Sequence, residues 1–334
     1  RHIARAGARD FYEGETAQSI LRVAAAEGGM LAAEDLRDFR PEWVTPIGQD
    51  YRGYRLHEIP PNGQGIAALI AVGILQHFDV ASLPVDSVRS QHLQIEAMKL
   101  AFADVYRYVA DPRSMECNPD EMLAPAYLAA RAKLIDPNRA TSFAPGMPRG
   151  GGTVYITAAD DRGMMVSFIQ SNYMGFGSGV VVRGTGISMQ NRGVGFSLDP
   201  KSPNVVAGGK KPFHTIVPAF VTRDGQPVMS YGVMGGEMQP QGHMQTLVRM
   251  IDYRQNPQAA CDAPRWKLNR DFSLDLEPTF PRAVAEGLAA MGHRTKWIDN
   301  SYQDFGAGQF IWRRPGTGYI AASDSRRDGY AAAR

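Results

Sequence analysis

The sequence has few cysteines, almost no net charge and no long apolar run. Its 334 residues include two cysteines, Cys117 and Cys261, which are far apart and exclude a disulfide framework or a cysteine metal cluster. The formal net charge is +2, so no overall attraction to nucleic acid or to an anionic membrane is expected. No apolar stretch reaches the roughly 18–20 residues of a membrane-spanning helix. We therefore expect a protein that binds neither nucleic acid nor membrane.

The first residues do not show the pattern of a signal peptide. Arg1-His2-Ile3 leads directly into an alanine-rich helical pattern, and such a beginning is typical of the interior of a longer chain. The remaining composition, 44% hydrophobic and 21% charged, is that of a globular protein with one large or two medium domains.

Helical patterns come first and strand patterns later. Apolar periodicity predicts a helical stretch over 1–27 that is interrupted at 11–14, helices over 33–36, 66–78 and 87–109, and strands over 45–59. Residues 116–152 are rich in proline and glycine and are expected to be irregular, with a mobile tail from about 138 to 152. Short strands are predicted from 153 to 231, then helices over 241–254, 256–260 and 281–291 and strands over 294–298, 308–312 and 318–322. This order indicates helical layers packed on sheets.

The residue at the head of the first strand after this boundary, Thr153, suits one kind of chemistry. Alternating residues over 154–159, a turn at 160–163 and an apolar run over 164–169 predict a hairpin. If the Gly152–Thr153 bond were cut, Thr153 would carry a free α-amine with a pKa near ~8 that can act as base for its own hydroxyl. The local pattern alone favours an ordinary hairpin in which Thr153 has no chemical role.

Three other features are interpreted as structural. His92 and Glu96 lie one helical turn apart, but no further histidine or carboxylate stands at ligand spacing, so a helix-surface pair is favoured over zinc. The glycines at 175–179 do not have the spacing of a phosphate-binding loop. The tryptophans Trp266, Trp297 and Trp312 are expected in the core or at subunit contacts.

Many short motifs follow one another in a fixed order along nearly the whole chain. They include residues 11–14, 51–54, 60–61, 96–104 and 111–112, then Thr153, 176–179, 185–187, Pro212, Gly235-Gly236, 263–265 and 322–324. In this order the chain resembles the γ-glutamyltransferase family of N-terminal nucleophile hydrolases. The resemblance implies an α+β fold, a four-layer αββα sandwich with two stacked, mainly antiparallel sheets.

The resemblance also implies a precursor that cuts itself before its nucleophilic threonine. Residues 1–152 would then be the later part of the large subunit and 153–334 the small subunit, together one intertwined domain. A further large-subunit segment, with the arginine that binds the substrate carboxylate, would precede residue 1. Such pairs sometimes form larger assemblies, and no metal or organic cofactor is implied.

Residue roles carry over position by position. Thr153 is the expected nucleophile, Ser171 stands where the family has a supporting threonine, and Gly235 and Gly236 match the oxyanion hole. The segment 191–196 departs from the family, because Gly195 replaces the aspartate that binds the α-ammonium group of a γ-glutamyl substrate. Tyr173, and His214 followed by Thr215, also differ from the family's residues.

These departures favour a small anionic amide as substrate, as in the subgroup that includes oxamate amidohydrolase. The candidate substrate-binding residues are Tyr173, Asn191, Arg192, His214 and Thr215. A surface position for Arg192 and a simple buried position for His214 remain open. So do a true γ-glutamyltransferase acting on glutathione and an unprocessed homologue that acts as a scaffold. Amidohydrolases of this kind tend to work in the cytoplasm, whereas the transpeptidases are mostly exported.

Overall fold

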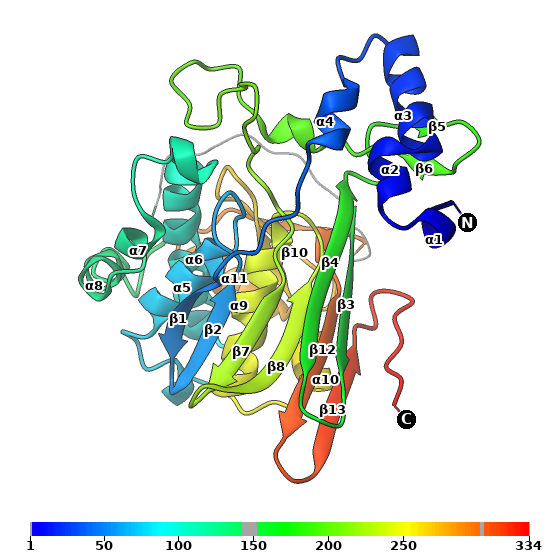
Figure 1. The fold of residues 1–334 in the computed structure, drawn as a ribbon. Helices are drawn as coiled ribbons and strands as arrows, with labels where there is room; N and C mark the ends of the chain where they lie inside the picture. Colours follow the sequence, from blue (N-terminus) through cyan, green and yellow to red (C-terminus); the bar gives the residue numbers. More distant parts are fainter. Residues whose placement is uncertain (1, 142–151, 301–303, 334) are drawn as a thin grey trace.

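A six-stranded antiparallel sheet is the centre of the computed structural model, which describes residues 2–141, 152–300 and 304–333 (Figure 1). Its strand order is β1-β2-β7-β8-β12-β13. The strands are β1 (Ile47–Tyr51), β2 (Tyr54–Glu58), β7 (Ala219–Arg223), β8 (Gln226–Val233), β12 (Gly308–Arg314) and β13 (Gly318–Ser323). The pairing of β2 with β7 joins residues from both sides of the predicted boundary at 152 in one sheet.

Helices cover one face of this sheet (Figure 1). They are α5 (Ile66–Leu75), α6 (Val88–Tyr108), α9 (Met238–Ile251) and α11 (Arg282–Ala290). Every residue of α5 is buried, because a helix that is apolar on all sides packs against neighbours all round. The Ser87 hydroxyl caps α6 by accepting from the Ser90 amide, as its sequence position predicts. None of the helices in the described ranges has the length and apolar character needed to cross a bilayer.

A two-stranded hairpin, β3 (Gly152–Ala159) and β4 (Met165–Tyr173), packs on the opposite face of the sheet. Thr157 Oγ1 lies 2.7 Å from Ser230 Oγ of β8, and Ser167 Oγ donates to the carbonyl of Ala219 in β7 at 2.9 Å. Val154, Ile156, Val166 and Phe168 on the alternate positions are exposed. The predicted α+β class, with two stacked antiparallel sheets and helices on the outer face of the larger one, is confirmed.

The N-terminal helices lie beside the open end of the hairpin (Figure 1). They are α1 (His2–Ala6), α2 (Arg9–Glu13), α3 (Glu15–Ala26) and α4 (Ala33–Arg37), and α3 contacts the short strand β5 (Val181–Val182), which pairs with β6 (Ile187–Ser188). The helical stretch expected over 1–27 is broken at Gly14, within the predicted interruption, and also at Gly7.

The prediction that residues 116–152 are irregular is wrong in its first half. Two short helices form there, α7 (Pro119–Met122) and α8 (Pro125–Ala132). Each begins with its proline at the first helical position, where the missing N–H costs no helical hydrogen bond. Most of the predicted tail, residues 142–151, lies outside the described residues.

A second, three-stranded sheet was not predicted in full. It has the order β11-β10-β9 and contains β9 (Trp266–Leu268), β10 (Leu274–Leu276) and β11 (Thr295–Trp297). The helix before it in the chain, α10 (Pro257–Asp262), packs on β12 and β13 of the central sheet. The first two strands are too short to show an alternating pattern. Trp266 is fully buried, as expected, whereas Trp297 is 37% exposed.

Candidate active site

Thr153 lies at the head of the hairpin, as its sequence position predicted. It is the second residue of β3, and Gly152 is opposite Tyr173 in the β3–β4 register. Thr153 and Ser171 line the same cavity of about 460 Å³, together with Asn172 and Gly175. The structure therefore brings the predicted nucleophile and its predicted supporting hydroxyl to one cavity.

The stacking of β3 on β8 relates the hairpin to the strand that leads into the glycine pair. Thr157 contacts Ser230, and a Cβ added to Gly232 would lie 2.5 Å from the ring of Tyr155. A step of two residues from Thr157 back to Tyr155 in β3 therefore matches a step of two residues from Ser230 forward to Gly232 in β8. Strands advance at similar rates of about 3.3 Å per residue, so we expect one further step of this kind to take Thr153 toward residues 234 and 235.

Gly235 and Gly236 form the turn from β8 into α9. Their φ angles are 115° and 63°, values that favour glycine. Within the described ranges, neither amide N–H donates to a protein acceptor, because both residues precede Glu237, the N-cap of α9, and lie outside the helical hydrogen-bond ladder. Free amides at the positive end of the α9 dipole suit an anion, which is the geometry that the predicted oxyanion hole needs.

Four of the predicted substrate-binding residues lie together at the end of β4. The Arg192 guanidinium lies 4.6 Å from the centroid of the buried Tyr173 ring, and its Nη1 donates to Thr215 Oγ1 at 2.6 Å. Asn191 Oδ1 accepts from the Met174 amide at 3.1 Å and so holds the segment that follows Tyr173. Arg192 itself belongs to a short 3-10 turn, residues 192–195.

Arg192 is a buried cation without a counterion among the described residues. It is 6% exposed, which is inconsistent with the alternative of a surface arginine, and its Nη2 has no hydrogen-bond partner. No carboxylate in the described ranges lies within ion-pair distance. Burial lowers the pKa of Arg192 to about 10, so the group is still charged at pH 7. An uncompensated buried charge is costly, and the site therefore favours an anionic ligand.

Gln64 connects this group to the glycine pair and was not predicted. Its Nε2 donates to the carbonyl oxygens of both Thr215 and Gly236, each at 2.8 Å. Its backbone N–H donates to His214 O at 2.9 Å. The proline- and glycine-rich loop at 60–65 marked the segment, but a glutamine in a loop carries no specific signal.

His214 is placed apart from the Thr153 cavity. It lines a different cavity of about 400 Å³ with Asn62 and Ile169, and its Nδ1 accepts from the Ile216 amide at 3.3 Å. Burial, and then the charge of Arg192, lower the pKa of His214 to about 4. The imidazole is therefore neutral at pH 7.

An ion pair beside the glycine turn was also missed. Glu237 follows Gly236, and its carboxylate pairs with Arg270, whose guanidinium lies 4.8 Å from the Tyr106 ring centroid. Burial raises the pKa of Glu237 although Arg270 acts in the opposite direction. Arg270 compensates the negative charge of Glu237, so this carboxylate does not repel an oxyanion at the expected site beside it.

The prediction that His92 and Glu96 form a helix-surface pair is wrong. Both are fully buried, because α6 packs between α5, α11 and β9. His293 joins them, and three ligand atoms of this group lie within 4.8 Å of one another. The sequence argument against a metal required a third ligand nearby in sequence, whereas this one comes from the loop after α11.

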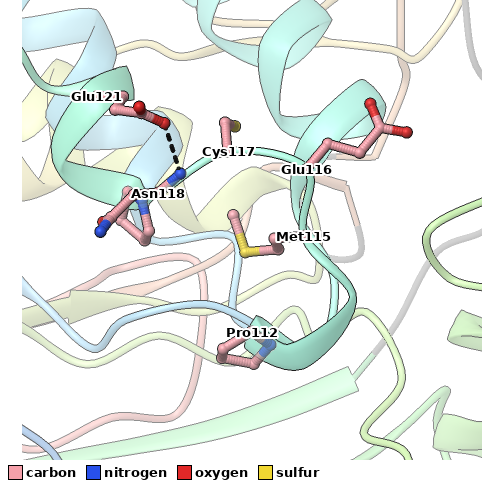
Figure 2. Close-up of a pocket in the computed structure, with 7 residues that line it drawn as sticks. Pro112, Met115, Glu116, Cys117, Asn118 and Glu121 are labelled. Carbon is pink, nitrogen blue, oxygen red and sulfur yellow. Dashed lines mark hydrogen bonds between the residues drawn. The ribbon is translucent and has the colours of Figure 1, made fainter.

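One further cavity, of about 400 Å³, lies in the connection before α7 (Figure 2). Glu121 accepts there from the Asn118 amide at 2.8 Å, which completes the cap of α7. Burial, and then Glu121, raise the pKa of Cys117, which disfavours a reactive thiolate. None of the predicted site residues lines this cavity.

Comparison with known proteins identifies relatives of this chain. The family model described as Gamma-glutamyltranspeptidase matches residues 1–334. The chain is 36% identical over 296 residues to the glutathione hydrolase-like YwrD proenzyme of Bacillus subtilis, covering 87% of the chain and 56% of that protein. It is 35% identical over 337 residues to the oxamate amidohydrolase proenzyme of Klebsiella pneumoniae, covering 99% of the chain and 63% of that protein.

Solved structures agree with this placement. The crystal structure of cephalosporin acylase from Bacillus halodurans matches with a TM-score of 0.93 and 50% identity, covering 99% of this chain and 60% of that one. The chain thus spans less than two thirds of the length of these relatives.

Proposed function

Because the chain belongs to the gamma-glutamyltranspeptidase family, we propose that it forms the catalytic part of a self-processing amidohydrolase. Cleavage at Gly152–Thr153 frees the α-amine of Thr153, which takes the proton of the Thr153 hydroxyl as that oxygen attacks an amide carbonyl. The amide nitrogen leaves protonated, and water then hydrolyses the acyl ester. The amides of Gly235 and Gly236 stabilise the oxyanion, each by about 3 kcal/mol.

The substrate class follows from Arg192. Its buried guanidinium has an unused Nη2, and a carboxylate of the substrate supplies the missing counterion through charge-assisted hydrogen bonds. The oxamate amidohydrolase relative supports a small anionic amide. This unpaired cation, connected through Thr215 and Gln64 to the glycine pair, is the observation that carries the proposal.

Arg192→Met tests it, because methionine keeps much of the volume and removes the charge. We expect the KM for oxamate, measured by ammonia release, to rise by about 10- to 100-fold, the value of a hydrogen bond to a charged group. Arg192→Lys should lose less, because it retains the charge without the planar fork. Equal KM values for the wild type and Arg192→Met would contradict the assigned substrate.

A γ-glutamyltransferase acting on glutathione is the second candidate, because several relatives are named glutathione hydrolases. Position 195 speaks against it: a Cβ added to Gly195 would lie 2.4 Å from Phe213 O, so the family's ammonium-binding aspartate has no room here. Turnover of γ-glutamyl-p-nitroanilide faster than that of oxamate would favour this candidate.

An unprocessed scaffold is the remaining alternative. A denaturing gel distinguishes it, because self-cleavage gives two fragments, the second beginning at Thr153. Thr153→Ala should remain one chain without activity, and cleavage of this variant would contradict the mechanism. The proenzyme names of the relatives support a precursor, and we infer that 1–152 and 153–334 are the ends of a large and a small subunit.

A further inference from the structure

A second group of titratable side chains is buried in the helical layer, outside the site described above. His92, Glu96 and Lys99 succeed one another on one face of α6, and His293 reaches them from the loop after α11. The exposed fractions are 0% for His92 and Glu96, 3% for Lys99 and 4% for His293. Burying a charged pair and two imidazoles is costly unless their polar atoms are satisfied.

The two charged groups both bind one backbone residue, Thr141. Lys99 Nζ lies 2.7 Å from Glu96 Oε1. The other carboxylate oxygen, Oε2, accepts from the Thr141 amide at 3.0 Å, and Lys99 Nζ also donates to the Thr141 carbonyl at 3.2 Å. The Glu96 carboxylate thus binds the backbone N–H of Thr141, and the Lys99 ammonium binds the carbonyl of the same residue. Both are charge-assisted hydrogen bonds.

The two imidazoles bind the beginning of the same segment. His92 Nε2 lies 2.8 Å from the Asp136 carbonyl, which can only accept, so this nitrogen carries the proton. His92 Nδ1 therefore accepts from His293 Nε2 at 2.8 Å. Burial, followed by Lys99 and His92, lowers the pKa of His293 to about 3. Residues 136–141 are consequently held at both ends.

A metal ion fits this group poorly, although three ligand atoms lie close together. The facing nitrogens of His92 and His293 already share a proton, and the ammonium of Lys99 already neutralises Glu96. A divalent cation would have to displace that proton and lie beside a positive charge.

We propose that His92, Glu96, Lys99 and His293 form an anchor that positions the chain for self-cleavage at Gly152–Thr153. The inference rests on the proposed function. Thr153 is the twelfth residue after Thr141, which limits the reach of the connection to roughly 40 Å. Fixing one end of it raises the fraction of time that the scissile bond spends at the reacting groups. The four side chains touch no reacting atom and are positioning residues.

The test is the double variant Glu96→Gln/Lys99→Met in the full-length precursor, which removes both charges together and leaves neither unpaired. We expect self-cleavage to slow by at least about tenfold, while the kcat and KM of the product, once cleaved, keep their wild-type values. The matched control is Asp104→Asn/Arg131→Met, which removes another ion pair of α6, at 2.6 Å, that has no hydrogen bond to residues 136–141. This control should cleave at the wild-type rate.

Wild-type cleavage by the Glu96→Gln/Lys99→Met variant, or equal slowing in the control, would overturn the anchor. Hydrogen exchange tests the anchor without depending on the proposed function. In uncut Thr153→Ala protein, the peptide containing Thr141 should exchange faster after the double substitution, and unchanged protection overturns the anchor even if the wild type never cuts itself. One equivalent of zinc kept through dialysis and lost in His293→Ala would overturn it in favour of a metal centre.

Discussion

Two buried basic residues next to Thr215 differ in charge at pH 7, although burial lowers the pKa of both. Arg192 keeps its proton at pH 7 because its pKa falls only to about 10. His214 loses its proton because burial and the nearby Arg192 lower its pKa to about 4. The site therefore presents one positive charge rather than two, which the single negative charge of the proposed substrate would compensate.

The lowered pKa of His214 makes folding sensitive to acid. Above the unfolded value of 6.5 both states are neutral at this residue, so it contributes nothing there. Between 6.5 and about 4 the unfolded chain binds a proton that the folded chain does not, so stability falls as the pH falls, by up to about 3 kcal/mol.

His214→Asn tests this, because an amide oxygen can accept from the Ile216 amide as Nδ1 does, without titrating. We expect the free energy of unfolding, measured in urea between pH 7 and 4.5, to depend less on pH than in the wild type. His77→Asn, at an exposed position after α5, is the control and should leave the slope unchanged. An unaltered slope in His214→Asn would mean that the histidine is not held neutral by the fold.

Residue identity suggested candidate reactive groups more readily than the connections between them. Thr153, Ser171 and the glycine pair were proposed from motifs, and Arg192 from a departure from a motif. Gln64 and His293 were not, because a bridging amide or a partner 201 positions away leaves no local pattern.

At the level of elements, the stacking of β3 on β8 sets the position of Thr153. The contact depends on Gly232, because a Cβ there would lie 2.5 Å from the Tyr155 ring. We expect Gly232→Ala to destabilise the protein by about 1–3 kcal/mol through overpacking, measured by urea unfolding of the uncut Thr153→Ala chain. It should also slow self-cleavage in the chain that retains Thr153.

Gly208→Ala provides the matched comparison. Nothing lies within 4 Å of a Cβ at this position, and its φ is not in the left-handed region, so the substitution should change stability by less than about 1 kcal/mol. Equal effects of the two substitutions would show that the hairpin does not pack on β8 in this register.

Long periodic helices and alternating strands could be predicted from the sequence, and α5, α6 and the β3–β4 hairpin lie where their patterns indicated. Two kinds of element could not. The short strands β9 and β10 depend on neighbours in space rather than on alternation, and α7 and α8 begin at prolines that also mark loops. The burial of His92 likewise depends on α11, which no periodicity of α6 reveals.

For the molecule as a whole, the order of strands in the central sheet determines what cleavage does. β1 and β2 precede the proposed cut, whereas β7, β8, β12 and β13 follow it. The two fragments share the ladder between β2 and β7, in which Leu56 pairs with Val221, and a core that includes α5 and α9. Separating them would expose this core, so each fragment depends on the other for its fold.

We therefore expect the chains 1–152 and 153–334, co-expressed separately, to form one complex that elutes as a single species under native conditions. Both chains should lose their structure together in urea, in a single transition. Circular dichroism and fragment exchange would monitor this transition. The separate chains make this result independent of whether the protein cuts itself. Fragments that elute apart, or a 153–334 chain that folds alone, would contradict a shared core, because half of a continuous sheet cannot bury the apolar side chains that the other half normally covers.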